Sequence, residues 1–319
     1  MVDTRIYYCC DIHASNVCFR KVLNATKHGL YKANVVIVGG DLTGKRIIPI
    51  VKQSNGENTC EFLEKTHVMK TDEELAQMKK LIGDSGFYPY LTEPDQVAEL
   101  RSNRTKFDEL ITQLILERMR EWIKLADERL AGLSTQFYML AGNDDDPRCG
   151  EIISSSKSIK NPDGQVVNLD GVHEMISSGA SNATPWKTPG EFTEDELEAM
   201  FEKMISDVKN PRNLILNLHV PPYDSGLDVA PKLNEQLQPV LVGGEFIRIP
   251  VGSIAVLKII QKYQPKLGLF GHIHEAGGDV FIGKTLCVNP GSEYSEGILR
   301  GYVIDLNEKG VKEFYRVEG

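Results

Sequence analysis

Seven polar residues in this chain are candidates for binding divalent cations: Asp11, His13, Asp41, Asn143, His219, His272 and His274. Each of them follows closely on a short apolar run that we predict to be a β-strand. A carboxylate, amide or imidazole at every strand end would be costly without a compensating positive charge, which a divalent cation supplies. Oxygen donors mixed with imidazoles, and no thiolate among them, suit first-row ions such as Mn, Fe, Zn, Ni or Co better than calcium.

The spacing of these residues indicates more than one ion. In Asp11-Ile12-His13 and His272-Ile273-His274 the outer residues stand at positions i and i+2, and such side chains point in similar directions when the backbone is extended. The first pair could therefore bind one ion together, and the second could bind one ion or serve two. Seven ligands are too many for one tetrahedral ion with an open position, and about right for two ions that share a carboxylate.

The elements that carry the first ligands form a β-α-β pattern. The run Arg5–Cys10 predicts a strand, Ser15 predicts the N-cap of a helix that continues to His28, and Asn34–Val38 predicts a second strand. Both strands are apolar throughout, which is typical of a sheet covered on both faces. Asp11 and Asp41 lie just past the carboxyl ends of these strands, where open α/β sheets place their sites.

The rest of the chain continues to alternate between strands and helices. We expect strands at Gln136–Ala141, Asn213–Leu218 and Leu267–Phe270, helices at Thr193–Val208 and Val251–Tyr263, short strands across 151–177, and β-hairpins from 280 to 317.

Residues 45–133 have a different pattern and are predicted to be an insertion. Arg46–Lys52 and Asn58–Lys65 predict a hairpin around Ser54-Asn55-Gly56. Thr71 begins a capping-box pattern before a helix, and the pattern from Pro94 to Leu130 is helical with one apolar face. The insertion could be a lid, a dimer surface or plain structure.

Composition limits the classes of protein that fit. The chain has 319 residues, with 36 Lys and Arg against 45 Asp and Glu, so the net charge of −9 argues against wholesale coating of nucleic acid. No run approaches the roughly 18 apolar residues of a membrane span, and the first residues lack the pattern of a secretory signal. Six cysteines without C-x-x-C spacing indicate a reducing compartment, so we expect a cytoplasmic protein that does not bind membranes.

The order of the candidate motifs resembles that of the calcineurin-like metallophosphoesterase family. That family has D-x-H, G-D, G-N-H-[DE], H and G-H-x-H in sequence, and this chain has Asp11-Ile12-His13, Gly40-Asp41, Gly142-Asn143-Asp144-Asp145, His219 and Gly271-His272-Ile273-His274. Asn289-Pro290-Gly291-Ser292 is also similar to a turn common in the family. The resemblance covers residues 1–44 and about 134–295, and leaves the insertion at 45–133 outside.

The resemblance implies a fold, a metal site and a reaction. The fold is α/β: one metallophosphoesterase domain over residues 1–319, a four-layer α/β/β/α sandwich that carries a mostly helical insertion at about 45–133. The reaction is hydrolysis of small phosphodiesters or phosphomonoesters by a metal-bridging hydroxide, with manganese among the candidate metals. The metal roles implied are a first ion held by Asp11, His13 and His274, a second held by Asn143, His219 and His272, and a bridge formed by Asp41.

One position departs from the family pattern. The His that usually follows Asn in G-N-H is Asp144 here, and the family uses that His to stabilise the phosphoryl group or to protonate the leaving alcohol. An ionised carboxylate repels a phosphate, and it can donate a proton only where its pKa is raised. We keep Asn143 and Asp144 as the candidate catalytic residues and leave the identity of the general acid open.

Two alternatives to a small-molecule phosphoesterase remain. One is a non-catalytic scaffold or binding module on the same fold, which the replacement of His by Asp144 favours. The other is a nuclease, because the insertion contains Arg101, Arg104, Lys106, Arg118 and Arg120; these alternate with acidic residues, which is more typical of a solvated face. The expected partner is therefore a phosphoester substrate, with nucleic acid less favoured and a second copy of the chain conceivable through residues 45–133.

Overall fold

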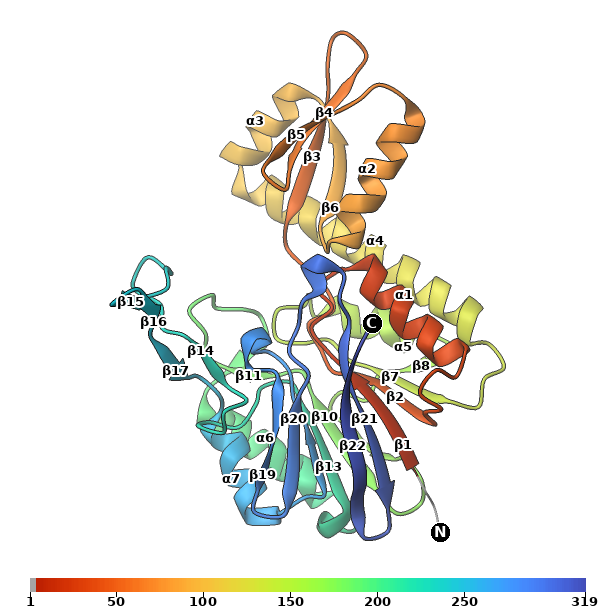
Figure 1. Ribbon diagram of the computed structural model, residues 1–319, viewed down its shortest axis with the longest axis vertical. Helices are drawn as coiled ribbons and strands as arrows, with labels where there is room; N and C mark the ends of the chain where they lie inside the picture. Colours follow the sequence, from red (N-terminus) through yellow and green to blue (C-terminus); the bar gives the residue numbers. More distant parts are fainter. Residues whose placement is uncertain (1–3) are drawn as a thin grey trace.

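The apolar runs form the centres of two six-stranded sheets in the computed structural model, which describes residues 4–319 (Figure 1). In spatial order the first sheet contains β22 (Gly310–Glu318), β21 (Arg300–Asn307), β1 (Thr4–Cys9), β2 (Val35–Val38), β7 (Gln136–Met139) and β8 (Ile159–Lys160). The second contains β19 (Gly278–Ile282), β20 (Thr285–Asn289), β18 (Leu267–Leu269), β13 (Leu214–Leu218), β10 (Glu174–Ser178) and β9 (Val166–Asn168).

Parallel pairing at the centre of both sheets explains the apolar character of these strands. β1, β2, β7 and β8 are parallel to one another, and so are β10, β13, β18 and β20, while the outer strands β21, β9 and β19 pair antiparallel. Such strands are buried on both faces, and their carboxyl ends point to one edge. The C-terminal segment, expected to form only hairpins, contributes β20 as a parallel strand, because residues far apart in the chain pair there.

Helices cover the outer faces of the two sheets, and the inner faces pack against each other. The helices α1 (Asn16–Lys27), α4 (Arg104–Leu130) and α5 (Arg148–Ser154) share a core with the first sheet. The helices α6 (Glu194–Ser206) and α7 (Ile254–Tyr263) share a core with the second. A third apolar cluster joins Tyr8 and Ile37 of the first sheet to Ile215, Leu267 and Leu269 of the second, so the sheets lie face to face.

A smaller lobe, residues 45–103, projects from this main body (Figure 1). Its sheet has the order β5 (Lys65–Met69), β4 (Asn58–Phe62), β3 (Ile47–Lys52), β6 (Tyr88–Thr92), and its helices are α2 (Asp72–Asp84) and α3 (Pro94–Ser102). The predicted hairpin between β3 and β4 and the capping box at Thr71 are present. The strands β5 and β6 were not expected from the sequence. The lobe has its own apolar core, which includes Ile50 and Phe62.

The helical segment from Pro94 to Leu130 is two helices rather than one. The side chain of Asn103 accepts a hydrogen bond from the Lys106 amide, so it caps α4 and ends α3. Good helix formers stand on both sides of Asn103, which is why the periodicity of the sequence did not reveal the break. The apolar face of α4, including Met119 and Trp122, packs into the core of the main body, so this helix belongs to both parts of the molecule.

Two segments outside the main sheets differ from expectation or were not predicted. The helix α5 occupies the start of the region that we expected to contain only short strands. Residues 229–250 form a projecting arm of two short antiparallel pairs, β14 (Val229–Pro231) with β17 (Arg248–Pro250) and β15 (Leu241–Val242) with β16 (Glu245–Phe246) (Figure 1). The remaining pair, β11 (Ser181–Asn182) with β12 (Glu191–Phe192), lies beside the sheet edge.

Among residues 4–319, no helix is both long enough and apolar enough to cross a bilayer.

Candidate metal centre

The carboxyl ends of five parallel strands bring the candidate ligands to one edge. Asp11 and His13 follow β1, Asp41 follows β2, Asn143 follows β7, His219 follows β13, and His272 and His274 follow β18. Contacts between the two sheets close the edge: the hydroxyl of Tyr8 donates to the Phe270 carbonyl at 3.0 Å, and the His272 amide donates to Asp11 Oδ2 at 3.1 Å.

Six of these residues form two groups, each of which could hold a metal ion. The first ligand group is Asp11, His13 and His274, and the second ligand group is Asp41, His219 and His272. Within each group the donor atoms lie within 4.8 Å of one another. The groups touch, because Asp41 Oδ2 is 3.7 Å from His13 Nε2 while Asp41 Oδ1 is 3.3 Å from His219 Nε2. The two oxygens of Asp41 therefore face different groups.

The backbone is strained where the ligands sit. Asp11, His13, Asp41 and His272 have positive φ angles of 53°, 35°, 47° and 66°. Each such non-glycine residue costs on the order of 1–3 kcal/mol and persists only where the surroundings enforce it. Four such residues at one sheet edge indicate that the backbone there is held in a locally unfavourable conformation that directs these side chains toward one another.

Two motif glycines allow the ligand loops to approach each other. A Cβ on Gly142 would lie 2.1 Å from Asp41 Oδ1, and a Cβ on Gly271 would lie 2.4 Å from Asp11 Oδ2. Any larger residue would push a candidate ligand out of place. The glycine before Asn143 and the glycine before His272 are thus explained by close packing against carboxylates.

Two buried polar residues hold the ligand loops together. Asp145 accepts hydrogen bonds from the amides of Gly142, Leu42 and Thr43 at 2.8, 2.9 and 2.8 Å, which ties the loop after β7 to the loop after β2. Burial above all raises the pKa of Asp145 to about 6. Asn289 donates to the carbonyls of Gly271 and Ile273, which fixes the loop after β18.

Hydrogen bonds to backbone carbonyls orient two of the imidazoles. Nδ1 of His13 lies 3.1 Å from the Thr43 carbonyl, and Nδ1 of His219 lies 3.1 Å from the Gly39 carbonyl. A carbonyl accepts a hydrogen bond from the Nδ1–H group, so in the neutral imidazole Nε2 is the atom with a free lone pair. This is the arrangement that metal-binding histidines commonly have.

Asn143 is held by a separate loop. Its amide nitrogen donates to Thr188 Oγ1 at 2.7 Å, and the Thr188 hydroxyl in turn donates to Glu191 Oε1 at 2.9 Å. The Gly190 amide donates to the Asn143 carbonyl at 3.0 Å. Because the nitrogen is engaged, the side-chain oxygen of Asn143 faces the other way, where it is buried and has no hydrogen-bond partner.

The two carboxylates attract positive charge to this edge. Burial disfavours ionisation of Asp11, but His274 and His219 outweigh it and lower its pKa to about 2. Burial also opposes the charged form of His219, yet Asp41 and Asp11 raise the pKa of this imidazole to about 9. In contrast, burial and the neighbouring His219 lower the pKa of His272 to about 4. The ligand set therefore combines buried carboxylates with one imidazole whose charged form is favoured, His219, and one whose neutral form is favoured, His272.

The unpaired atoms of the site fit divalent cations. Nε2 of His219, Nδ1 of His272 and Oδ1 of Asn143 are buried without a hydrogen-bond partner, although buried polar atoms are normally satisfied. In the first ligand group, Nε2 of His13 and Nε2 of His274 lie 2.9 Å apart, and both of these atoms are candidate metal donors. Imidazole, amide and carboxylate donors of this kind suit borderline first-row ions.

Residues outside the predicted set surround the open side of the site. Lys45 forms an ion pair with Asp144, and the Asp144 amide donates to Asp41 Oδ1 at 3.2 Å. The ring of Tyr294 packs against His13 with the ring centres 4.8 Å apart. Lys45, Thr188, Glu191 and Tyr294 lack a motif in the sequence, and we find no spacing or composition signal that could have identified them.

The carboxyl group of Asp144 is placed between opposing influences. Burial raises its pKa from the usual value, and the charge of Asp41 adds to that effect, whereas Lys45 lowers it. The neighbouring acids do not act on it as a cluster: Asp145 binds backbone amides, and Asp146 pairs with Arg148 at 2.7 Å. Asp144 is thus the acidic residue of this loop that faces the ligand groups.

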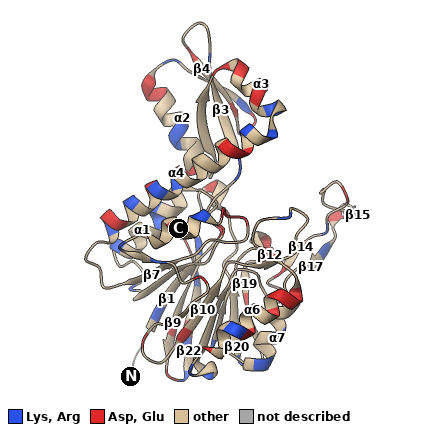
Figure 2. Ribbon diagram, turned by 180° about the vertical axis from the view of Figure 1, so that it is seen from behind, with Lys and Arg blue, Asp and Glu red and all other residues tan. Residues whose placement is uncertain are grey.

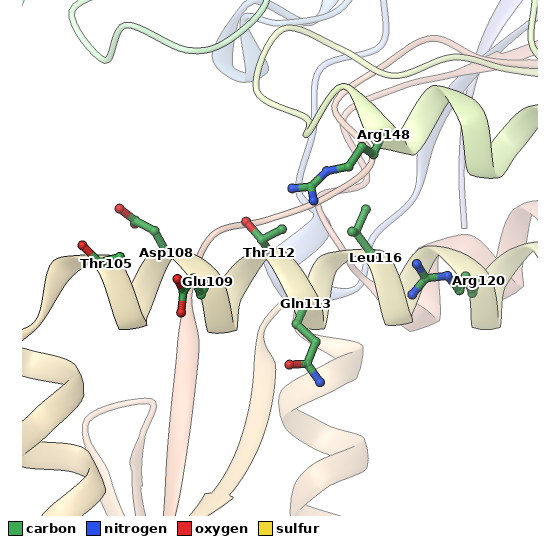
Figure 3. A pocket seen from close by; sticks show the side chains of 8 residues that line it. All are labelled: Thr105, Asp108, Glu109, Thr112, Gln113, Leu116, Arg120 and Arg148. Atoms are coloured by element: carbon green, nitrogen blue, oxygen red, sulfur yellow. The ribbon is translucent and has the colours of Figure 1, made fainter.

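A separate groove of about 610 Å³ runs along α4, away from the ligands. Figure 3 shows Arg148 from the start of α5 pointing toward Thr112 and Leu116 of α4, with Asp108 and Arg120 farther along the helix. None of the seven candidate ligands lines this groove. Its walls carry both signs of charge and do not form a continuous basic track.

Comparison with known proteins gives one relative by sequence. The chain is 34% identical over 168 residues to the uncharacterized protein MJ1162 of Methanocaldococcus jannaschii, a match that covers 51% of this chain and 68% of that protein. The chain belongs to the same family as MJ1162. No family model matches the sequence.

Solved structures share the fold at low sequence identity. One crystal structure matches with a TM-score of 0.60 at 16% identity, and the protein TT1561 of Thermus thermophilus matches with a TM-score of 0.54 at 13% identity; each alignment covers 99% of both chains. The mixed α/β architecture, including the lobe, therefore has counterparts in overall shape.

Proposed function

We propose that this chain is a dimetal phosphoesterase of the calcineurin-like type, and that its facing sheets with their outer helices are the four-layer α/β/β/α sandwich of that family. The single observation that supports this most is the convergence of six Asp and His residues into two adjacent ligand groups. Motifs far apart in the sequence meet there, in the order that the family has. The solved structures that match support the fold, and neither they nor MJ1162 carry information on the reaction.

The residues divide into three roles in this proposal. Asp11, His13 and His274 would hold the first ion, and Asn143, His219 and His272 the second. Asp41 would be shared, which fits the placement of its two oxygens toward His13 and His219 at 3.7 and 3.3 Å. When bound, two such ions lower the pKa of a water molecule and offset the charge on phosphoryl oxygens.

The protein's own contribution is to hold these groups in place and to limit water. Carbonyls of Thr43 and Gly39 keep Nε2 of His13 and of His219 directed inward. The Thr188 hydroxyl keeps the oxygen of Asn143 directed inward. Tyr294 covers one side of His13 and His274, with ring centres 4.8 and 6.1 Å away. A substrate phosphate would thus meet a fixed array and need little rearrangement of the site.

The test is metal analysis combined with an activity assay. Purified protein supplemented with Mn²⁺, Zn²⁺, Co²⁺ or Ni²⁺ is expected to retain about two equivalents of metal. It is expected to hydrolyse bis-p-nitrophenyl phosphate or p-nitrophenyl phosphate. A folded, supplemented sample that retains no transition metal would contradict the proposal.

The replacement of the family His by Asp144 favours a second candidate, a non-catalytic scaffold. Metal retained without turnover of either ester, across all four metals, would select the scaffold.

The nuclease hypothesis gains little from the structure. Arg118 is buried, donates to the Ala14 carbonyl at 2.7 Å and is therefore not available to DNA. Figure 2 shows acidic and basic residues interspersed on α2, α3 and α4. Salt-dependent binding of single- or double-stranded DNA by the purified protein would support the nuclease hypothesis.

A further inference from the structure

Lys45 pairs with Asp144, the residue that stands at the family's His position in the sequence. It follows the loop Leu42-Thr43-Gly44, which runs along the backbone of the first ligand group: the His13 amide donates to the Asp41 carbonyl at 3.1 Å, and Nδ1 of His13 contacts the Thr43 carbonyl at 3.1 Å. A Cβ on Gly44 would lie 3.6 Å from the His13 carbonyl oxygen. The main chain of Lys45 is therefore fixed close to His13, although its side chain is long and flexible.

The ammonium group of Lys45 pairs with Asp144, the residue whose backbone contacts the shared carboxylate of Asp41. The two side chains form an ion pair, and the amide of Asp144 donates to Asp41 Oδ1 at 3.2 Å. The Lys45 side chain is 46% exposed and that of Asp144 is 27% exposed, so the pair is open to solvent on one side. The other side of the ion pair faces the sheet edge that carries the candidate metal ligands, where the Asp144 amide contacts Asp41. A molecule that approaches Asp41 from solvent would meet this ammonium group.

The Asp144 side chain cannot itself attract a phosphate to this edge. Asp11, Asp41 and Asp144 are three carboxylates there, and a phosphoester adds further negative charge. An ionised Asp144 in place of the family His repels a phosphate, even where bound metal ions offset Asp11 and Asp41. Lys45 is the cationic side chain that the structure pairs with Asp144. An ammonium group binds phosphate as a mobile point charge with three donors.

We propose that Lys45 is a substrate-contacting residue, held in reach by Asp144, whose ammonium group binds a phosphoryl oxygen of the substrate at this site. The inference rests on the proposed phosphoesterase function and names how the site recognises the phosphate. In this arrangement Asp144 is a positioning residue, because it acts through Lys45 and does not touch the phosphate.

A simpler role for Lys45 makes a different prediction. If Lys45 only neutralised Asp144, then removing both charges in Lys45→Ala/Asp144→Asn would restore an active site. If Lys45 binds phosphate, the double variant is as defective as Lys45→Ala alone. Lys52→Ala is the matched control, since Lys52 is also an exposed lysine paired with an acid, Glu93, at 3.2 Å, on strand β3 of the lobe.

The experiment measures kcat and KM for bis-p-nitrophenyl phosphate and p-nitrophenyl phosphate on manganese-loaded protein, with the metal content of each variant. We expect Lys45→Ala to lower kcat/KM on the order of 100-fold, as loss of one phosphate-directed donor does. We expect Lys45→Arg to stay within about tenfold of wild type, because it keeps the positive charge. Metal content stays at the wild-type level in all variants. Wild-type kinetics in Lys45→Ala, or recovery in the double variant, overturns the proposal.

Binding of inorganic phosphate separates this inference from the proposed function. Calorimetric titration of the metal-loaded protein measures its affinity for phosphate. We expect this affinity to fall about tenfold in Lys45→Ala, which is about 1.4 kcal/mol of binding free energy. We expect no change in Lys52→Ala. If the wild type hydrolyses neither ester but binds phosphate in a Lys45-dependent way, hydrolysis fails and the phosphate site stands. If the wild type hydrolyses esters but Lys45→Ala binds phosphate as tightly as the wild type, the proposed role of Lys45 is wrong and the proposed hydrolysis stands.

Discussion

The two ligand groups are built from the same residue types, and each has two buried residues and one partly exposed histidine, His272 or His274, so they differ in single residues and not in overall burial. In the second group, His219 has a fully buried side chain whose Nδ1 is fixed by the Gly39 carbonyl. In the first group, the side chain of His274 is 32% exposed and begins a short 3-10 helix, η2 (His274–Ala276). Tyr294, at the start of the 3-10 helix η3 (Tyr294–Glu296), is the ring that covers it.

The two groups also differ in what supports them. The second group is supported by core strands and by the loop that carries Thr188. The loop that leads to Lys45 contacts His13 of the first group. We expect the fully buried His219 to contribute more to stability than the partly exposed His274. Variants at the two groups should therefore differ in stability as well as in activity.

The largest expected effect follows from the residue that belongs to both groups. Asp41→Asn removes a charge that faces His13 and His219 together. We expect the variant to lose several kcal/mol of transition-state stabilisation from the bound ions, so its turnover rate should fall on the order of 1,000-fold or more. Elemental analysis should show fewer than two metal equivalents. Full metal content with near wild-type turnover would remove Asp41 from the bridging role.

A comparison of His219→Ala with His274→Ala tests this difference directly. We expect each variant to lose one metal equivalent, but only His219→Ala to lose substantial stability, because it also leaves a cavity in a buried position. Thermal unfolding monitored by circular dichroism should show a melting temperature several degrees lower for His219→Ala. Equal destabilisation by the two variants would show that the deeper burial of His219 does not add to stability.

The Thr188 hydroxyl should matter to the second group alone. In Thr188→Val the Asn143 amide loses its partner and is free to rotate, so affinity for one ion should fall by about 10- to 100-fold, which is typical of a lost supporting hydrogen bond. Thr188→Ser keeps the hydroxyl and serves as the control. Titration of metal into chelator-treated protein measures the metal affinity of both ion sites. If Thr188→Val leaves both affinities unchanged, Asn143 does not need the hydrogen bond to Thr188 in order to bind metal.

The smallest expected effect is that of Asp144→Asn. The variant keeps the amide that donates to Asp41 and loses only the charge that holds Lys45, so activity should fall by less than about tenfold and far less than in Asp41→Asn. Side-by-side kinetics with metal analysis provide the measurement. A loss comparable to that of Asp41→Asn, with metal retained, would mean that Asp144 itself takes part in the reaction.

Much of the fold followed from local signals in the sequence. Apolar runs marked β1, β2, β7, β13 and β18, and Ser15, Thr71 and Thr193 marked the starts of α1, α2 and α6, where each side chain caps the helix. These elements are predictable because strand burial and helix capping act over a few residues. The strands β5 and β6 were missed because they depend on pairing inside a lobe with its own core. The break at Asn103 was missed because good helix formers stand on both sides of it.

The sequence by itself determined which residue types stand at the strand ends, because motif order and spacing are properties of the chain. It also determined the two glycines, Gly142 and Gly271, that let the ligand loops lie against carboxylates. Only the tertiary structure decided how the ligands divide into two groups, which nitrogen of His13 and His219 faces inward, and that Thr188 and Lys45 belong to the site. Those features depend on contacts between residues about 30 to 260 positions apart, which no local pattern encodes.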